Sequence, residues 1–282
     1  MTGVDNTPFF LLGAARSGTT MLRLMLNRHS RLAIPFESHF LVRIFAELPT
    51  DRPLEIREAD RMVDLVVAEK NFQTWHLAPA CVRRKLVQLA PAPLAVLVDT
   101  LYQMEIADSG KLRWGDKTPY YYKCWPKLME LFSGAKLVHI IRDGRDVVQS
   151  LEKLAWHGPS ADDRARYWQE RVEMAHTASR QLGPKRNLII RYEDLVLDTR
   201  TTLKTICDFL EESFEPGMLH FFEDASKHIC DIDGDVHGKL ERPPSPGDVS
   251  RWRHEMPMAD QIRFEVIAGN GLRSMLYPCR FS

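Results

Sequence analysis

The chain has 282 residues, and its 38 Lys+Arg residues balance 38 Asp+Glu residues, which argues against a general nucleic-acid binder with its usual basic excess. No run approaches the roughly 18 apolar residues of a membrane-spanning helix, no positive segment opens the chain as in a secretory signal peptide, and the five cysteines contain no CxxC pair. We therefore expect a cytoplasmic protein with reduced thiols, no metal site, no nucleic-acid partner and no integral membrane segment.

The first predicted elements are a strand, a glycine turn and a helix. An apolar run covers 8–12, a turn with Gly13 and Gly18 follows, and good helix formers fill 21–26. This order is typical of the first unit of an α/β protein.

Two further apolar runs, at 136–142 and 187–192, are too short for helices and predict strands buried on both faces. Helical patterns occur at about 38–48, 55–70, 80–110, 121–132, 144–156, 161–182, 194–211 and 257–270. Strands that alternate with helices predict an α/β fold of three layers, similar to P-loop proteins. Its centre would be a parallel sheet of about four or five strands, flanked by helices.

We expect 1–282 to form a single domain, because no internal repeat or domain linker is visible. The segment 231–249 is rich in Gly, Pro and Asp and has few apolar residues, which predicts a mobile loop that could cover a site. The region 45–110 contains no recognisable motif. The oligomeric state is left open, with a dimer as one option.

The glycine turn has the spacing of a nucleotide P-loop, but Thr19 stands where that motif has Lys. A turn between a strand and a helix N-terminus leaves backbone N–H groups free to bind an anion. Ser17, Thr19 and Thr20 add hydroxyl groups, and Arg16 adds a positive charge. The missing Lys argues against the usual ATP or GTP hydrolase. The simpler alternative is a capped helix start.

A second motif, R-D-G-R-D over 142–146, begins at the end of the second long strand, where open α/β sheets bind their ligands. Ser150 follows about two helical turns after Arg142 and could reach the same anion. The alternative is a surface network of Arg and Asp at a helix start.

Together, the R-S-G-T-T segment over 16–20 and the 142–150 motif resemble the cofactor motifs of the sulfotransferases that use 3′-phosphoadenosine 5′-phosphosulfate (PAPS). The R-S-G-T-T form of the first motif is similar to that of the branch that contains tyrosylprotein sulfotransferases and bacterial small-molecule enzymes. The resemblance implies that 17–20, including Gly18, hold the 5′-phosphosulfate and that Arg16 touches the sulfuryl oxygens. It also implies that Arg142 and Ser150 bind the 3′-phosphate.

The same resemblance extends to two later residues. It implies that Tyr192 packs near the adenine, although a core aromatic at a strand end is the alternative. It also implies that Arg242, in the predicted loop, closes on the nucleotide.

The resemblance further implies an acid–base pair. Glu37 matches the family's general base, and Lys117 matches the lysine that stabilises the leaving group together with Arg16. Helix-dipole complementation by Glu37, and an exposed pair between Lys117 and Asp116, are the alternatives. His39 is the second candidate for the base, because another branch of the superfamily uses a histidine.

The resulting hypothesis is a sulfotransferase that moves the sulfuryl group of PAPS to a hydroxyl group by in-line transfer, leaving 3′,5′-adenosine bisphosphate (PAP). The acceptor would be a small molecule, lipid or glycoconjugate. One alternative is a kinase-like phosphoryl transferase that uses ATP and magnesium, disfavoured by Thr19. The other is a nucleotide-binding protein without turnover, disfavoured by the presence of Glu37 and Lys117.

Overall fold

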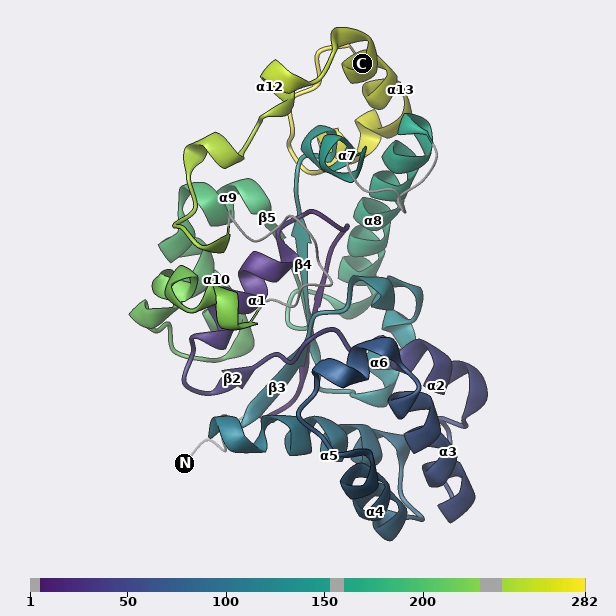
Figure 1. The fold of residues 1–282 in the computed structure, drawn as a ribbon. Coiled ribbons are helices and arrows are strands. Elements are labelled where there is room, and N and C mark those ends of the chain that lie inside the picture. The colour runs from purple at the N-terminus through teal and green to yellow at the C-terminus, as the bar shows by residue number, and fades with distance from the viewer. Residues whose placement is uncertain (1–5, 153–159, 229–239, 282) are drawn as a thin grey trace. The chain divides into compact units, whose positions relative to one another are not determined.

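The computed structural model describes residues 6–152, 160–228 and 240–281 and contains a five-stranded parallel sheet flanked by helices. Figure 1 shows the course of the chain through these elements. The strand order is β2-β3-β1-β4-β5. The strands are β1 Phe9–Leu12, β2 Leu32–Ala33, β3 Arg113–Asp116, β4 Lys136–Ile141 and β5 Asn187–Arg191. The predicted α/β fold with four or five parallel strands is confirmed.

The two strands that the sequence analysis did not predict are β2 and β3. β2 has two residues, and β3 has the sequence R-W-G-D, which is not an apolar run. All four β3 residues are nevertheless buried. Arg113 is accommodated because its Nε donates to the carbonyl oxygen of Thr7 at 2.7 Å, so its buried charge has a polar partner.

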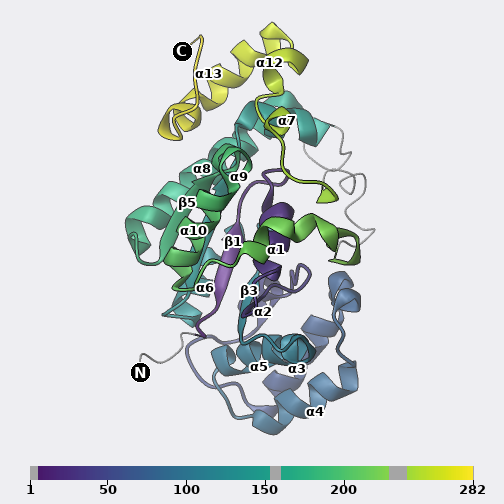
Figure 2. The same cartoon turned by 90° about the vertical axis from the view of Figure 1, so that its left-hand side faces the viewer.

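The chain divides into two compact units. Unit 1 contains 1–10 and 26–136. Its helices are α2 Leu41–Glu47, α3 Ile56–Val67, α4 Pro79–Leu89, α5 Leu94–Ile106 and α6 Trp125–Leu131. Helices α3 and α4 pack against each other (Figure 2). The single helix predicted over 80–110 is two helices, because Pro91 and Pro93 interrupt the backbone hydrogen bonding between them.

Unit 2 contains 11–25 and 137–282, and thus the second half of β1. Its elements besides β4 and β5 are α1 Thr19–Asn27, whose last residues belong to unit 1, then α7 Gly144–Glu152, α8 Ala161–Leu182, α9 Tyr192–Leu197, α10 Thr199–Leu210, α12 Trp252–Glu255 and α13 Met258–Ser274. Helix α8 packs along α13 and α7. Their common core is built around buried Trp168, Phe264 and Trp252.

Helix boundaries in unit 2 follow local capping. Ser160 accepts a hydrogen bond from the N–H of Asp163 at 3.1 Å and starts α8, which agrees with the predicted helix over 161–182. The predicted helix over 194–211 is two helices that meet at Asp198. The backbone N–H of Asp198 donates to the carbonyl oxygen of Asp194 at the end of α9, and its side chain accepts from the N–H of Thr201 at the start of α10.

Of the loop predicted over 231–249, the part 231–239 lies outside the described residues. The remainder contains the short 3₁₀ turn Pro246–Asp248. Within the described ranges, no helix is both long and apolar enough to cross a membrane.

His139 lies in the middle of β4 and is fully buried. Burial lowers the pKa of its imidazole to about 4 from the usual 6.5. The unfolded chain therefore binds a proton below pH 6.5 that the folded chain does not bind, so this group lowers stability as the pH falls from 6.5 towards 4. We expect His139→Leu to reduce the loss of unfolding free energy between pH 7 and 4.5 by about 2–3 kcal/mol. Urea titrations at both pH values would measure this, and parallel losses in the two proteins would contradict it.

Candidate active site

Residues 13–18 of unit 2 connect β1 to α1, and we call them the phosphate loop because their sequence predicts an anion site. Arg16 and Gly18 have φ angles of 69° and 89°, which belong to the left-handed region. A Cβ atom at position 18 would lie 2.5 Å from the ring of Tyr192, so only glycine fits there. Left-handed residues next to right-handed ones turn successive N–H groups to one side, which makes an anion-binding concavity.

Two buried polar atoms beside this loop lack partners. Ser17 is fully buried, and its Oγ has no hydrogen-bond partner among the described residues. Arg142 is only 8% exposed, and its Nε also has no hydrogen-bond partner among the described residues. Unsatisfied buried polar groups are costly in a folded protein. A hydroxyl oxygen and a guanidinium Nε that have no partner among the described residues therefore fit a bound anion such as a phosphate or sulfate group.

Arg142 lies at the end of β4, where it contacts the phosphate loop. Its Nη1 approaches the carbonyl oxygen of Arg16 at 3.4 Å, and its Nη2 donates to a carboxylate oxygen of Asp146 at 3.1 Å. Its guanidinium lies 4.7 Å from the ring centroid of Tyr192. The structure thus brings Arg142, Tyr192 and the loop together.

Ser150 and Arg242 also lie close to this group. The Nε of Arg16 donates to the Oγ of Ser150 at 2.8 Å. Arg242 binds both carboxylate oxygens of Asp248 at 2.6 and 2.9 Å, and the carbonyl oxygen of Asp248 accepts from Arg142 Nη2 at 3.0 Å. Asp248 therefore joins Arg142 and Arg242, two of the three arginines that were predicted to bind the cofactor.

The remaining predicted residues begin α1, where Thr19 is buried and Thr20 is half-buried. Sequence reasoning missed Tyr167 on α8, whose phenol oxygen accepts a hydrogen bond from the N–H of Ala15 at 2.9 Å. The neighbouring Trp168 donates its indole N–H to the carbonyl oxygen of Arg142 at 2.9 Å. One turn of α8 thus holds both the loop and the end of β4.

The residues predicted to form the acid–base pair lie in unit 1. Lys117, at the end of β3, is 2% exposed and donates from its Nζ to Oε1 of Glu37. The other carboxylate oxygen of Glu37 is 2.9 Å from Nε2 of His39. Helix α2 begins at Leu41, so Glu37 precedes it and is not in its first turn. Lys117 pairs with Glu37 and is buried, unlike a lysine in an exposed pair with Asp116.

The pKa values in this group follow from its charges. Burial alone would raise the pKa of Glu37, but the charge of Lys117 and the hydrogen bonds from His39 and Lys117 outweigh it and lower the pKa to about 2. Burial would lower the pKa of His39, but its hydrogen bond to Glu37 raises the pKa above 6.5. Glu37 is therefore a carboxylate held by the Lys117 ammonium group and by the imidazole of His39.

A buried polar network fixes the two segments that carry this pair. Asp116 accepts hydrogen bonds from the Tyr102 hydroxyl at 2.6 Å and from Ser38 Oγ at 2.7 Å. The N–H of Ser38 donates to Oγ1 of Thr118 at 3.0 Å. Ser38 and Asp116 are the direct neighbours of Glu37 and Lys117, so the network positions both chemical groups. Apart from the positions of Ser38 and Asp116 next to Glu37 and Lys117, no sequence feature indicated this network.

Within the part of the chain that the structure describes, no cluster of three or more His, Cys, Asp or Glu side chains could hold a metal ion. Residues 8–216 match the model of the sulfotransferase family. The chain belongs to the sulfotransferase family.

Similarity to individual proteins extends over most of the chain. A protein-tyrosine sulfotransferase of Drosophila melanogaster is 26% identical over 266 residues, which are 90% of this chain and 48% of that protein. The chain spans about half the length of the first curated relatives that it matches.

Solved structures show the same fold. The sulfotransferase domain of the Synechococcus PCC 7002 olefin synthase has a TM-score of 0.70 at 24% identity, covering 99% of this chain and 98% of that one. A mouse sulfotransferase solved in complex with PAP has a TM-score of 0.53 at 14% identity, covering 96% of this chain and 85% of that one. These similarities establish the fold of the family.

Proposed function

We propose that the chain transfers the sulfuryl group of PAPS to a hydroxyl group of a small-molecule, lipid or glycoconjugate acceptor. The observation that carries the proposal is the phosphate loop of a sulfotransferase-family chain, in which the buried Ser17 hydroxyl has no partner among the described residues. Thr19 in place of the P-loop lysine disfavours the use of ATP with magnesium.

The residues of unit 2 supply the binding chemistry. The N–H and hydroxyl groups of 17–20 suit the 5′-phosphosulfate, because they are donors at a helix N-terminus. Arg142 and Ser150 would hold the 3′-phosphate, Arg242 would close on the nucleotide, and Arg16 would touch the sulfuryl oxygens. Tyr192 would offer its ring to the adenine. Arg142 suits the 3′-phosphate because a guanidinium group donates hydrogen bonds in a fixed fork.

PAPS supplies a sulfuryl group that is attached to a phosphate leaving group. Oε2 or Oε1 of Glu37 accepts the proton of the acceptor hydroxyl, as a general base. Lys117 Nζ and the Arg16 guanidinium supply positive charge for the oxygen on which negative charge develops.

The low pKa of Glu37 assigns a second role to Lys117. A carboxylate with a pKa of about 2 is a weak base at neutral pH. The charge of Lys117 contributes to that low value, so the basicity of Glu37 rises when Lys117 donates elsewhere. When Lys117 leaves Glu37 and donates to the leaving oxygen of PAPS, it stabilises the negative charge there. The same movement raises the pKa of Glu37, so the two effects are coupled.

Turnover tests this proposal. We expect incubation with PAPS carrying ³⁵S to give labelled product only when a hydroxyl acceptor is present, with one PAP formed for each label transferred. A panel of phenols, aliphatic alcohols, sterols and sugars would identify the acceptor class. Transfer of label to none of them, in a chain that binds PAP tightly, would favour a binding protein; transfer of phosphate from ATP would favour a kinase.

Tyr167→Phe is expected to weaken PAP binding about 5–10-fold, because the Ala15 N–H loses its acceptor and the phosphate loop loses one fixed point. Gln169→Ala is the matched control, since Gln169 on the same helix accepts from the N–H of Gly271 at 3.0 Å, away from the loop. Calorimetry with PAP and thermal melting should show similar losses of stability but a change in affinity for Tyr167→Phe alone. Equal affinities would show that Tyr167 does not position the loop.

A further inference from the structure

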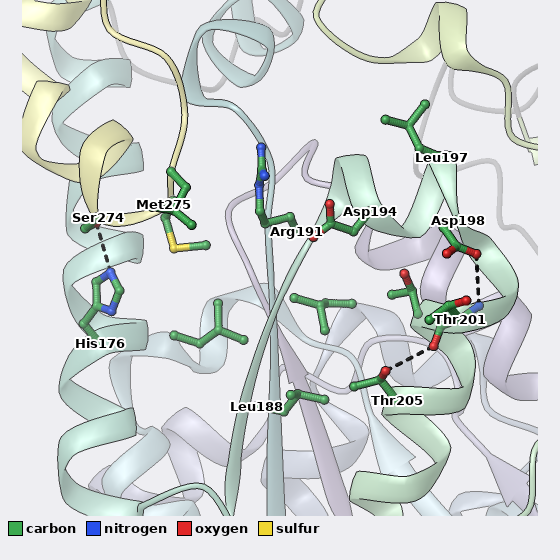
Figure 3. A pocket seen from close by; sticks show the side chains of 14 residues that line it. His176, Leu188, Arg191, Asp194, Leu197, Asp198, Thr201, Thr205, Ser274 and Met275 are labelled. Atoms are coloured by element: carbon green, nitrogen blue, oxygen red, sulfur yellow. Dashed lines mark hydrogen bonds between the residues drawn. The ribbon is translucent and has the colours of Figure 1, made fainter.

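Helix α9 follows directly on strand β5 and has two different sides. Arg191, Asp194 and Leu197 line a hollow of about 610 Å³ beside the strand (Figure 3). Tyr192 and Glu193 do not line this hollow, and they are only 8% and 6% exposed. These two side chains are therefore directed into the interior of unit 2.

The pairing of β4 and β5 determines what they meet there. The two parallel strands are in register up to the residues directly before Arg142 and Tyr192, so these two side chains follow paired strand ends. The next two residues are joined by a hydrogen bond, because the N–H of Asp143 donates to Oε1 of Glu193 at 3.0 Å. The end of β4 and the start of α9 thus meet residue by residue.

The ring of Tyr192 lies between the phosphate loop and Arg142. A Cβ atom on Gly18 would lie 2.5 Å from Cδ2 and 2.7 Å from Cε2 of this ring, so the ring packs against the glycine backbone. The Cζ atom of Arg142 lies 4.7 Å from the ring centroid, which is within the range of a cation–π contact. Both contacts are made by the ring and not by the hydroxyl group.

The hydrogen bonds of Arg142 leave the orientation of its guanidinium group incompletely fixed. Nη2 donates to Asp146 at 3.1 Å and to the carbonyl oxygen of Asp248 at 3.0 Å. Nη1 is 3.4 Å from the carbonyl oxygen of Arg16, and Nε has no partner among the described residues. Strong hydrogen bonds at one nitrogen allow the plane to tilt about that atom. The Tyr192 ring restricts this tilt, because a guanidinium group that leaves the ring face loses the cation–π contact.

We propose that the Tyr192 ring positions the Arg142 guanidinium for the 3′-phosphate and sets its distance from the phosphate loop. The ring contacts both of the groups that would bind the two phosphates, so it favours nucleotides that carry a 5′-phosphate and a 3′-phosphate together. The inference rests on the proposed function, in which Arg142 binds the 3′-phosphate. Tyr192 acts here as a positioning residue through Arg142, and this role is separate from a contact of the same ring with the adenine.

The ratio of the affinities for PAP and ADP isolates this role. Both nucleotides carry adenine, so a contact between Tyr192 and the base cancels in the ratio, whereas only PAP carries the 3′-phosphate. We expect Tyr192→Leu to lower the ratio by about tenfold or more, and Tyr192→Phe, which keeps the ring, to leave it within about twofold. Isothermal calorimetry with both nucleotides would measure the ratio. An unchanged ratio in Tyr192→Leu, or an equal loss in Tyr192→Phe, would overturn the proposal.

Phe214→Leu is the matched control. Phe214 is half-buried in the same unit, and its ring centroid lies 5.4 Å from Cζ of Arg200, so the substitution also removes a ring that contacts an arginine. The ratio should stay within about twofold of the wild-type value. A loss as large as that in Tyr192→Leu would contradict the proposal. If melting curves show that Tyr192→Leu is unfolded, Tyr192→Met, which fills more of the same space, takes its place with the same expected loss.

A double-mutant cycle tests whether Tyr192 acts through Arg142. In Arg142→Ala the guanidinium group is absent, so adding Tyr192→Leu should change the ratio by less than about twofold. A further loss of about tenfold in this background would show that the ring acts independently of Arg142, and would overturn the proposal. Equal binding of PAP and ADP by the wild-type chain would contradict the proposed function itself. A wild-type preference for PAP that persists in Tyr192→Leu would contradict this inference alone.

Discussion

Glu37→Gln is expected to lower kcat by roughly 10²–10⁴-fold, the usual contribution of a positioned general base. The KM for PAPS should change less than about threefold, because the proposed role of Glu37 is proton transfer and not nucleotide binding. Glutamine preserves the shape of the side chain and can still accept from Lys117. Initial rates at saturating acceptor, with PAP formation as the readout, would measure the effect.

His39→Gln separates the two candidates for the base. If Glu37 is the base, the loss of the hydrogen bond from His39 should cost kcat much less than Glu37→Gln. A larger loss in His39→Gln than in Glu37→Gln would transfer the role to His39.

Because the pKa of Glu37 is about 2, its carboxylate is ionised at both pH 6 and pH 8. The fold-loss in Glu37→Gln should therefore be similar at these two pH values. Melting curves would confirm that both variants are folded.

Arg142→Ala is expected to weaken PAP binding by about 100-fold and to change ADP binding by less than threefold. Hydrogen bonds to charged groups contribute about 1.5–3 kcal/mol each, and ADP lacks the 3′-phosphate that Arg142 would bind. Isothermal calorimetry with both nucleotides would measure the change in preference.

Two further variants control for folding. Arg142→Lys keeps the charge beside Asp146 but loses the planar fork, so it should give an intermediate loss of PAP affinity. Arg251→Ala removes a half-buried arginine that pairs with Glu255 in the same unit, and it should leave PAP binding within twofold. Equal weakening of PAP and ADP in Arg142→Ala would mean that Arg142 supports the fold and does not select the 3′-phosphate.

The sequence predicted those strands whose apolar runs report burial on both faces. β4 and β5 fall within two residues of their predicted bounds. β3 was missed because Arg113 and Asp116 are buried polar residues, and their burial depends on partners elsewhere in the chain, such as the carbonyl oxygen of Thr7 and the Tyr102 hydroxyl. A pattern based on local hydrophobicity cannot detect such compensation.

In the candidate site too, local sequence patterns could not predict contacts between residues that lie far apart in the chain. The motifs identified Arg16 and Arg142, but the hydrogen bond from Ala15 to Tyr167 spans 152 residues of sequence and the contact between Arg142 and Asp248 spans 106. The pair of Glu37 and Lys117 is separated by 80 residues. Contacts at such separations depend on how elements far apart in the sequence pack, so they became visible only in the structure.

Calorimetric titration of the wild-type chain with PAP, beside ADP and Mg-ATP, tests the central claim most directly. The account predicts a PAP dissociation constant in the micromolar range or below, and at least 100-fold weaker binding of ADP, because only PAP carries the 3′-phosphate. Equal binding of PAP and ADP, or a preference for Mg-ATP, would contradict the assignment of the unit 2 site to PAPS.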